Sequence, residues 1–203
     1  MSALVFHLYN SPFVGAPELK ALSKEYGLPL WLSEFYTPSA FDWVEKVHSL
    51  LADYDVSAVD YQFGYFGEAS AAQLISVLHG GVNYFGFRTE SHFHVFGNYS
   101  KFVRPGAVRV GVTAVRDNIK VSAFTRGGRL VIVAINSADD AGTTVRFDIA
   151  GLTSNGAFSA VRTLPESGGA NRQVTLPAIA PSGGSIVALL PPRSVSTFYQ
   201  SPP

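Results

Sequence analysis

The chain has 203 residues, with 15 basic and 15 acidic side chains and a formal net charge of zero at pH 7. This balance excludes the basic surface typical of nucleic-acid-binding domains and gives no attraction to an anionic membrane surface. Cysteine is absent, which excludes a disulfide scaffold, a cysteine nucleophile and the common thiolate zinc sites.

The first hundred residues predict strands that alternate with helices. Three short apolar runs are typical of buried strands and cover residues 3–9, 29–35 and 57–63. Three segments with apolar residues at helical spacing follow them, at residues 16–26, 39–53 and 68–78. Near-continuous apolar strands that alternate with helices predict βαβ units, in which helices cover a parallel sheet.

After the Arg-Pro-Gly turn at residues 104–106 the pattern changes to short strands separated by turns. We expect eight strands there, at residues 107–115, 119–125, 129–136, 143–149, 159–164, 173–176, 185–190 and 194–200. Gly127 and Gly128 predict a two-residue hairpin between two of them. The second half therefore predicts an antiparallel β-sandwich, with a domain boundary near residue 105.

Polar and aromatic side chains gather where the predicted parallel strands end. His7 and Tyr9 close the first strand, Glu34 closes the second, and Tyr61 and Tyr65 follow the third. Active sites of parallel α/β folds form at the carboxyl ends of the strands. We therefore take these five side chains as candidate site residues.

Glu34 is the sharpest candidate. Strict alternation along the strand would place Glu34 on the face of Leu30 and Leu32, with Trp31 and Ser33 on the other face. A carboxylate at the end of an apolar strand can act as a nucleophile or a general base. It can also form a salt bridge to the following helix, and the pattern leaves both interpretations open.

The remaining candidates also have two interpretations each. His7 and Tyr9 share a face by alternation, and His7 is either a base or hydrogen-bond donor, or a structural residue whose hydrogen bonds are satisfied. Tyr61 and Tyr65 either stack on sugar rings or pack in the core and at its rim.

Metal and cofactor sites have little support. His92 and His94 lie two residues apart, with Glu90 near them in the sequence. In a strand this spacing would point both rings to one side, but no further ligand is evident. The nucleophile elbow, the Walker loop, the dinucleotide-binding glycine motif and the zinc-protease helix are all missing. We therefore predict neither a metal nor a cofactor.

The sequence gives two hints about location. Its first residues lack the basic and apolar regions of a signal peptide, and no run approaches the roughly 18 apolar residues of a membrane span. We therefore expect a soluble chain without an export signal. The low charge and the sequon Asn98-Tyr99-Ser100 nevertheless resemble those of secreted proteins.

Four segments resemble stretches of glycoside hydrolase family 30, in that family's order. They are residues 5–9 (Val-Phe-His-Leu-Tyr), 30–35 (Leu-Trp-Leu-Ser-Glu-Phe), 96–107 (Phe-Gly-Asn-Tyr-Ser-Lys-Phe-Val-Arg-Pro-Gly-Ala) and 191–198 (Pro-Pro-Arg-Ser-Val-Ser-Thr-Phe). Family members are retaining glycosidases with a (β/α)8 TIM barrel and an attached β-sandwich. The resemblance implies that residues 1–105 are the last three βα units of such a barrel, strands six to eight, and that residues 106–203 are the sandwich.

The resemblance also implies roles for the candidate residues. Glu34 falls at the position of the nucleophile, Tyr9 would hydrogen-bond this nucleophile or the substrate, and His7 would line the same subsite. Tyr61 stands where the family usually has a tryptophan beneath the sugar, and Tyr65 would be a further aromatic contact. By the alternation argument, Trp31 and Ser33 would be packing residues.

The chain also departs from the family. The family's acid/base lies in an asparagine–glutamate pair, and no such pair occurs in this sequence. The 203 residues are fewer than the roughly 250 of a complete barrel. We therefore expect the C-terminal part of a secreted glycosidase acting on β-linked glycans, with the acid/base in a missing N-terminal half.

Two alternatives stay open. In one, the upstream half is a separate chain of a two-chain enzyme. In the other, the chain is a non-catalytic β-sandwich that binds carbohydrate or stabilises a partner, with a barrel remnant attached.

Overall fold

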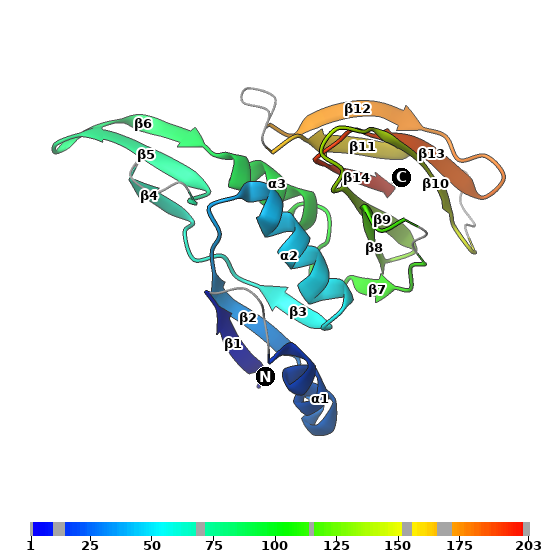
Figure 1. Cartoon of the computed structure of the whole chain (residues 1–203), viewed down its shortest axis with the longest axis horizontal. Helices are drawn as coiled ribbons and strands as arrows, with labels where there is room; N and C mark the ends of the chain where they lie inside the picture. The colour runs from blue at the N-terminus through cyan, green and yellow to red at the C-terminus, as the bar shows by residue number, and fades with distance from the viewer. Residues whose placement is uncertain are drawn as a thin grey trace. The chain divides into compact units, whose positions relative to one another are not determined.

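The computed structural model describes residues 2–9, 15–67, 72–113, 116–151, 156–165 and 172–200. Contacts divide the chain into two compact units, residues 1–93 and 94–203, whereas the change in sequence pattern falls near residue 105. The elements of both units are labelled in Figure 1.

The first unit begins with a parallel three-stranded sheet in the order β1-β2-β3. The strands are β1 (Leu4–Leu8), β2 (Leu30–Phe35) and β3 (Val56–Val59). The connecting helices are α1 (Ala16–Tyr26) and α2 (Ala40–Ala52). The prediction of parallel strands joined by two helices is thus confirmed.

Local sequence explains where these helices begin and end. The Ser39 side chain caps α2 by accepting a hydrogen bond of 3.1 Å from the Asp42 amide. Helix α1 ends at Gly27, whose φ of 62° is a left-handed conformation that glycine adopts without steric cost. Trp43 of α2 stacks on Phe35 of β2 with a centroid distance of 5.8 Å, and both side chains are fully buried. This contact packs α2 against the sheet.

The prediction of a third helix over residues 68–78 is wrong for the part that the structure describes. Residues 68–71 lie outside the described ranges, and residues 75–78 belong to a three-stranded sheet. Its strands are β4 (Tyr65–Gly67), β5 (Ile75–Gly80) and β6 (Asn83–Thr89). Gly81, with a φ of 61°, allows the tight turn between β5 and β6. The β-branched and aromatic residues of both strands favour this pairing over a helix.

The second unit contains the eight predicted sandwich strands, and the antiparallel β-sandwich is confirmed. A six-stranded sheet has the order β12-β11-β14-β9-β8-β7, and β10 pairs with β13. The strands are β7 (Val108–Val110), β8 (Ile119–Arg126), β9 (Arg129–Asn136), β10 (Thr143–Asp148), β11 (Phe158–Thr163), β12 (Val174–Ile179), β13 (Ser185–Leu190) and β14 (Ser194–Gln200).

The second unit also contains the predicted hairpin turn, a shared apolar core and a helix that precedes the strands. Gly127 and Gly128 have φ values of 56° and 73°, the pair of positive angles that a two-residue hairpin turn requires. Alternate residues of the two sheets form one apolar core, which includes Phe147, Phe158 and Phe198. Helix α3 (Ser91–Ser100) precedes the sandwich, and it contains the two histidines for which a strand was considered.

Candidate functional site

The carboxylate of Glu34 lies beside His7 where β1 and β2 end. Glu34 Oε2 is 3.5 Å from His7 Nδ1, and the side chain of Glu34 is 31 % exposed. Glu34 and His7 are also direct partners in the parallel pairing of the two strands. The two side chains therefore lie on the same face of the sheet, partly open to solvent.

Tyr9 completes this group. Its hydroxyl donates a hydrogen bond to Glu34, which, together with burial and the negative charge, raises the pKa of Tyr9 to about 12. The Tyr9 ring also meets the His7 ring edge-on, with a centroid distance of 5.7 Å. The phenol thus remains protonated at physiological pH and supplies a hydrogen-bond donor to the carboxylate.

The face on which Glu34 lies differs from the one that strict alternation predicts. The strand pairing matches Phe6 with Leu32 and His7 with Glu34, so Ser33 is an extra residue in β2. Leu30, Leu32 and Phe35 are fully buried. The buried positions of β2 are therefore spaced by two residues and then by three, which marks the extra residue. Glu34 therefore points away from the buried layer that holds Leu30 and Leu32.

Trp31 and Ser33 consequently have other positions than expected. Trp31 pairs with the exposed Val5 of β1, and both lie on the open face that carries His7 and Glu34. The apolar Phe35 directly after Glu34 is a sequence signal for this change of phase, because it breaks the two-residue period. Strict alternation from Leu30 therefore places Glu34 on the wrong face.

Tyr61 occupies a different environment from this group. Its ring stacks on His92 at 5.8 Å and contacts Phe35 and Trp43 edge-on at 5.5 and 5.7 Å. Its hydroxyl donates a hydrogen bond of 2.5 Å to the Ala72 carbonyl. Burial raises the pKa of Tyr61 above its usual range. The structure thus brings His7, Tyr9 and Glu34 together and packs Tyr61 among buried aromatic rings.

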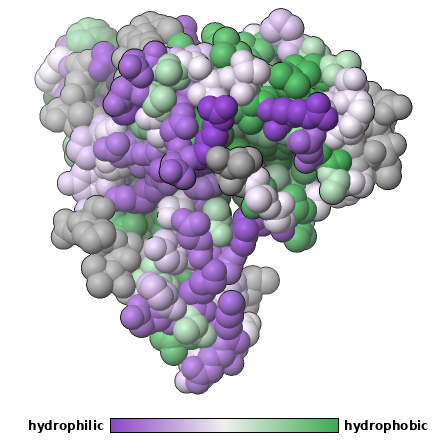
Figure 2. Space-filling model, turned by 45° about the vertical axis from the view of Figure 1, so that its right-hand side comes forward, coloured by the Kyte–Doolittle hydropathy of each residue, from purple (hydrophilic) through white to green (hydrophobic). Residues whose placement is uncertain are grey.

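Tyr65 lies in β4, and its side chain is highly exposed, at 74 %. Other exposed aromatic side chains occur nearby in sequence on β6, among them Tyr84 and Phe87. Over the face drawn in Figure 2, hydrophobic residues are interspersed with hydrophilic ones. Tyr65 is therefore an aromatic residue of the surface.

The histidines of α3, His92 and His94, lie on different sides of the helix. Residues two positions apart on a helix are separated by about 200° around its axis, so His92 and His94 point in different directions. His92 Nε2 lies 2.8 Å from the Thr37 carbonyl oxygen, and Glu90 accepts hydrogen bonds from Ser76 and Arg88. Within the described residues, no group of three or more metal-ligating side chains occurs.

Asn98 of the sequon is fully buried. Its amide nitrogen donates to the His94 carbonyl at 3.1 Å and to Thr163 Oγ1 at 2.8 Å. Thr197 Oγ1 donates to Asn98 Oδ1 at 2.9 Å. Asn98 thus joins α3 to β11 and β14 and has a structural role that the sequon does not indicate.

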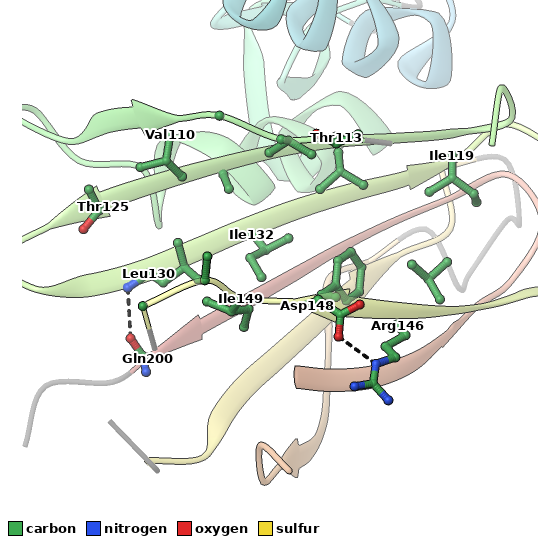
Figure 3. Close-up of a pocket in the computed structure, with 18 of the residues that line it drawn as sticks. Val110, Thr113, Ile119, Thr125, Leu130, Ile132, Arg146, Asp148, Ile149 and Gln200 are labelled. Carbon is green, nitrogen blue, oxygen red and sulfur yellow. Dashed lines mark hydrogen bonds and ion pairs between the residues drawn. The ribbon is translucent and has the colours of Figure 1, made fainter. Parts of the chain in front are cut away.

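A pocket of about 830 Å³ opens in the sandwich, between β7–β9 and β10. Figure 3 shows mainly aliphatic side chains pointing into it, among them Val110, Ile119 and Ile132. At its margin Leu130 donates its amide hydrogen to Gln200 Oε1, and Arg146 pairs with Asp148 at 2.7 Å. Because its lining is mostly aliphatic, we interpret this pocket as an open part of the sandwich core rather than a catalytic site.

Among the helices that the structure describes, none is long and apolar enough to cross a membrane.

Comparison with known proteins relates both halves of the chain to one family. Residues 106–198 match the glycosyl hydrolase family 30 beta sandwich domain. The glucuronoxylanase XynC of Bacillus subtilis strain 168 is 29 % identical over 210 residues, which cover 98 % of this chain and 46 % of that protein. The chain therefore spans about half the length of this relative.

Solved structures give the same result. A family 30 endoxylanase from Clostridium papyrosolvens C71 matches 100 % of this chain and 49 % of its own, with 25 % identity and a TM-score of 0.74. The family 30 subfamily 8 xylanase Xyn30A from Clostridium acetobutylicum matches 98 % of this chain and 49 % of its own, with 26 % identity and a TM-score of 0.76. The resemblance to the C-terminal portion of this family is thus confirmed.

Proposed function

We propose that this chain, whose residues 106–198 match the glycosyl hydrolase family 30 beta sandwich domain, is the C-terminal part of a retaining glycosidase with Glu34 as its nucleophile. The observation that carries this proposal is the group of Glu34, His7 and Tyr9 at the ends of two adjacent parallel strands. Strands β1, β2 and β3 are, in this proposal, the last three strands of a (β/α)8 barrel, with residues 106–203 as the sandwich.

The proposed reaction has two steps. A carboxylate oxygen of Glu34 forms a bond to the anomeric carbon while the glycosidic C–O bond breaks, and the leaving oxygen takes a proton from a second carboxyl group. Water then attacks the anomeric carbon of the glycosyl-enzyme, the bond from this carbon to the Glu34 oxygen breaks and frees the carboxylate, and a proton of the water passes to that second group. Tyr9 donates a hydrogen bond to the Glu34 carboxylate and helps to hold it in place. This chemistry uses carboxyl groups and water, so it requires no cofactor.

The second carboxyl group would belong to an N-terminal half that this chain does not span. In retaining enzymes the two carboxyl groups are about 5–5.5 Å apart. Assembly with that half would also pair the free edges of the β1-β2-β3 sheet.

The proposed substrate is a β-linked polysaccharide. The relatives named above are xylanases and a glucuronoxylanase, which makes xylan the first substrate to test. Because polysaccharides of this kind lie outside the cell, we propose that the full-length parent is secreted.

Mechanism-based labelling tests this proposal. The chain is combined with the N-terminal half of a family 30 xylanase and treated with a 2-fluoro xyloside that traps the glycosyl-enzyme. We expect a covalent adduct on the peptide that contains Glu34, and none in the Glu34→Gln variant. An adduct on another residue, or none in an assembled complex that hydrolyses xylan, would contradict the assignment of Glu34.

A non-catalytic function is the second candidate, because the sandwich has an apolar core of its own. In that case residues 94–203 would bind xylan or stabilise a partner, and no assembled complex would hydrolyse glycans. Xylan affinity electrophoresis of this unit, beside activity assays of the complex, separates the two functions.

A further inference from the structure

Ser33 sits at the point where β2 changes phase, between the buried Leu32 and the site residue Glu34. The residue is unpaired in the register with β1, and its hydroxyl donates a hydrogen bond of 3.4 Å to the Phe6 carbonyl. An extra residue shifts every following side chain to the opposite face of a strand. If Ser33 were a regular, paired residue of β2, strict alternation would place Glu34 in the buried layer and Phe35 on the open face.

The same arrangement occurs once more in this sheet. Strand β3 pairs Val56 with Leu30 and Ala58 with Trp31, so Ser57 is an extra residue, and its hydroxyl donates to the Leu30 carbonyl at 3.2 Å. In both cases a serine hydroxyl bonds the neighbouring strand at the irregular position. Ser57 lies at the start of β3, however, and is not adjacent in sequence to a proposed site residue.

We infer that Ser33 is a positioning residue: its bulge, held to β1 by the hydroxyl, turns the Glu34 carboxylate out of the buried layer and toward His7. This inference rests on the proposed function for its catalytic meaning. Its geometric part is that Ser33 keeps the Glu34 carboxylate close to His7, and this part can be tested without any catalytic activity.

The length of the contact between Glu34 and His7 explains why the single hydrogen bond from Ser33 matters. Glu34 Oε2 and His7 Nδ1 are 3.5 Å apart, at the long end of hydrogen-bonding contact, so a small rotation of β2 separates them. Misplacement of a reacting group by about 1 Å can reduce a rate by up to about 100-fold. Loss of the Ser33 hydroxyl therefore acts on the chemical step through the position of Glu34.

NMR of the full 203-residue chain tests the geometric part. The His7 ring signals are recorded with and without Glu34→Gln in four backgrounds: native, S33A, S33T and S57A. We expect Glu34→Gln to shift the His7 signals in the native, S33T and S57A backgrounds, and to shift them clearly less in S33A. An undiminished response in S33A, with the fold retained by circular dichroism, would overturn the inference. So would an equal loss in S57A, because the effect would then be general loosening of the sheet.

Rates of the complex with the N-terminal half test the catalytic part. We expect S33A to lower kcat about tenfold with little change in KM, S33T to recover most of the rate, and S57A to remain within about twofold of the native rate. A change in KM alone would contradict a positioning role. A complex without any activity but with the expected NMR pattern would contradict the proposed function and leave the geometric part standing.

Discussion

His7 and Glu34 face each other across two adjacent parallel strands, with His7 Nδ1 3.5 Å from Glu34 Oε2. They are brought together because the strand pairing passes over Ser33. The contact joins residues that are 27 positions apart in the sequence and places a carboxylate next to an imidazole and a phenol.

Glu34→Gln in the assembled enzyme should abolish measurable xylan hydrolysis, because an amide cannot form the glycosyl-enzyme ester. The side chain is partly exposed, so the free energy of unfolding should change by less than about 1 kcal/mol. Rate assays and urea unfolding of the same preparation measure both effects. A strongly destabilised variant with residual activity would show that Glu34 is a structural ion-pair residue.

The phenol of Tyr9 should lose its proton at a higher pH than an ordinary tyrosine does. Its pKa is raised to about 12, from an ordinary value of 10, chiefly by the hydrogen bond to Glu34. The folded state therefore holds the phenolic proton more tightly than the unfolded state, and the associated stability is present below pH 10 and lost as the pH rises toward 12. Difference titration at 295 nm between the native chain and Tyr9→Phe should isolate this transition. In a Glu34→Gln background it should move toward pH 10.

Asn98→Ala should destabilise the second unit by about 2–4 kcal/mol. The change removes hydrogen bonds to His94 and Thr163 and leaves the buried Thr197 hydroxyl without its side-chain acceptor. Urea unfolding measures this, and Asn83→Ala, at an exposed position of β6, is the matched control with an effect within about 0.5 kcal/mol. Equal effects would remove the structural role assigned to Asn98.

The Asn98 sequon should remain unmodified in the folded chain, because its amide nitrogen is buried and already donates two hydrogen bonds. Intact-mass analysis after secretion from a glycosylating host measures this directly. A glycan on Asn98 of a folded chain would contradict the burial of this residue.

Gly81→Ala should destabilise the β5–β6 hairpin by about 1 kcal/mol or more, because Gly81 has a φ of 61° that alanine adopts with strain. Gly64→Ala is the control, since an added Cβ there meets open space and its φ lies outside the strained region. Thermal unfolding of the two variants compares them. A helix over residues 75–78, as the spacing predicted, would give no reason for this difference.

The sandwich strands, the first three parallel strands and the first two helices follow from local patterns. Their apolar periods of two or 3.6 residues, the Ser39 cap, and the turn at Gly127 and Gly128 all act within a few residues of the chain. The placement of His7, Tyr9 and Glu34 at strand ends was also predictable, because the end of an apolar run marks the end of a strand.

Other features depend on pairing between distant segments. The apolar spacing of residues 68–78 fits a helix, but β5 gains its hydrogen bonds from β4 and β6, which no local pattern reveals. The burial of Tyr61 depends on Phe35, Trp43 and His92, which are distant in sequence.

The sequence by itself thus determined that a carboxylate stands at the end of β2, and with it the chemistry available at that place. Only the tertiary structure decided on which face this carboxylate lies. Alternation fixes a face relative to the preceding residue only while the strand is regular, and the extra residue Ser33 is defined by the pairing of β2 with β1. Glu34 meets His7 because of that pairing, since the two side chains share a face only after the phase of β2 has shifted.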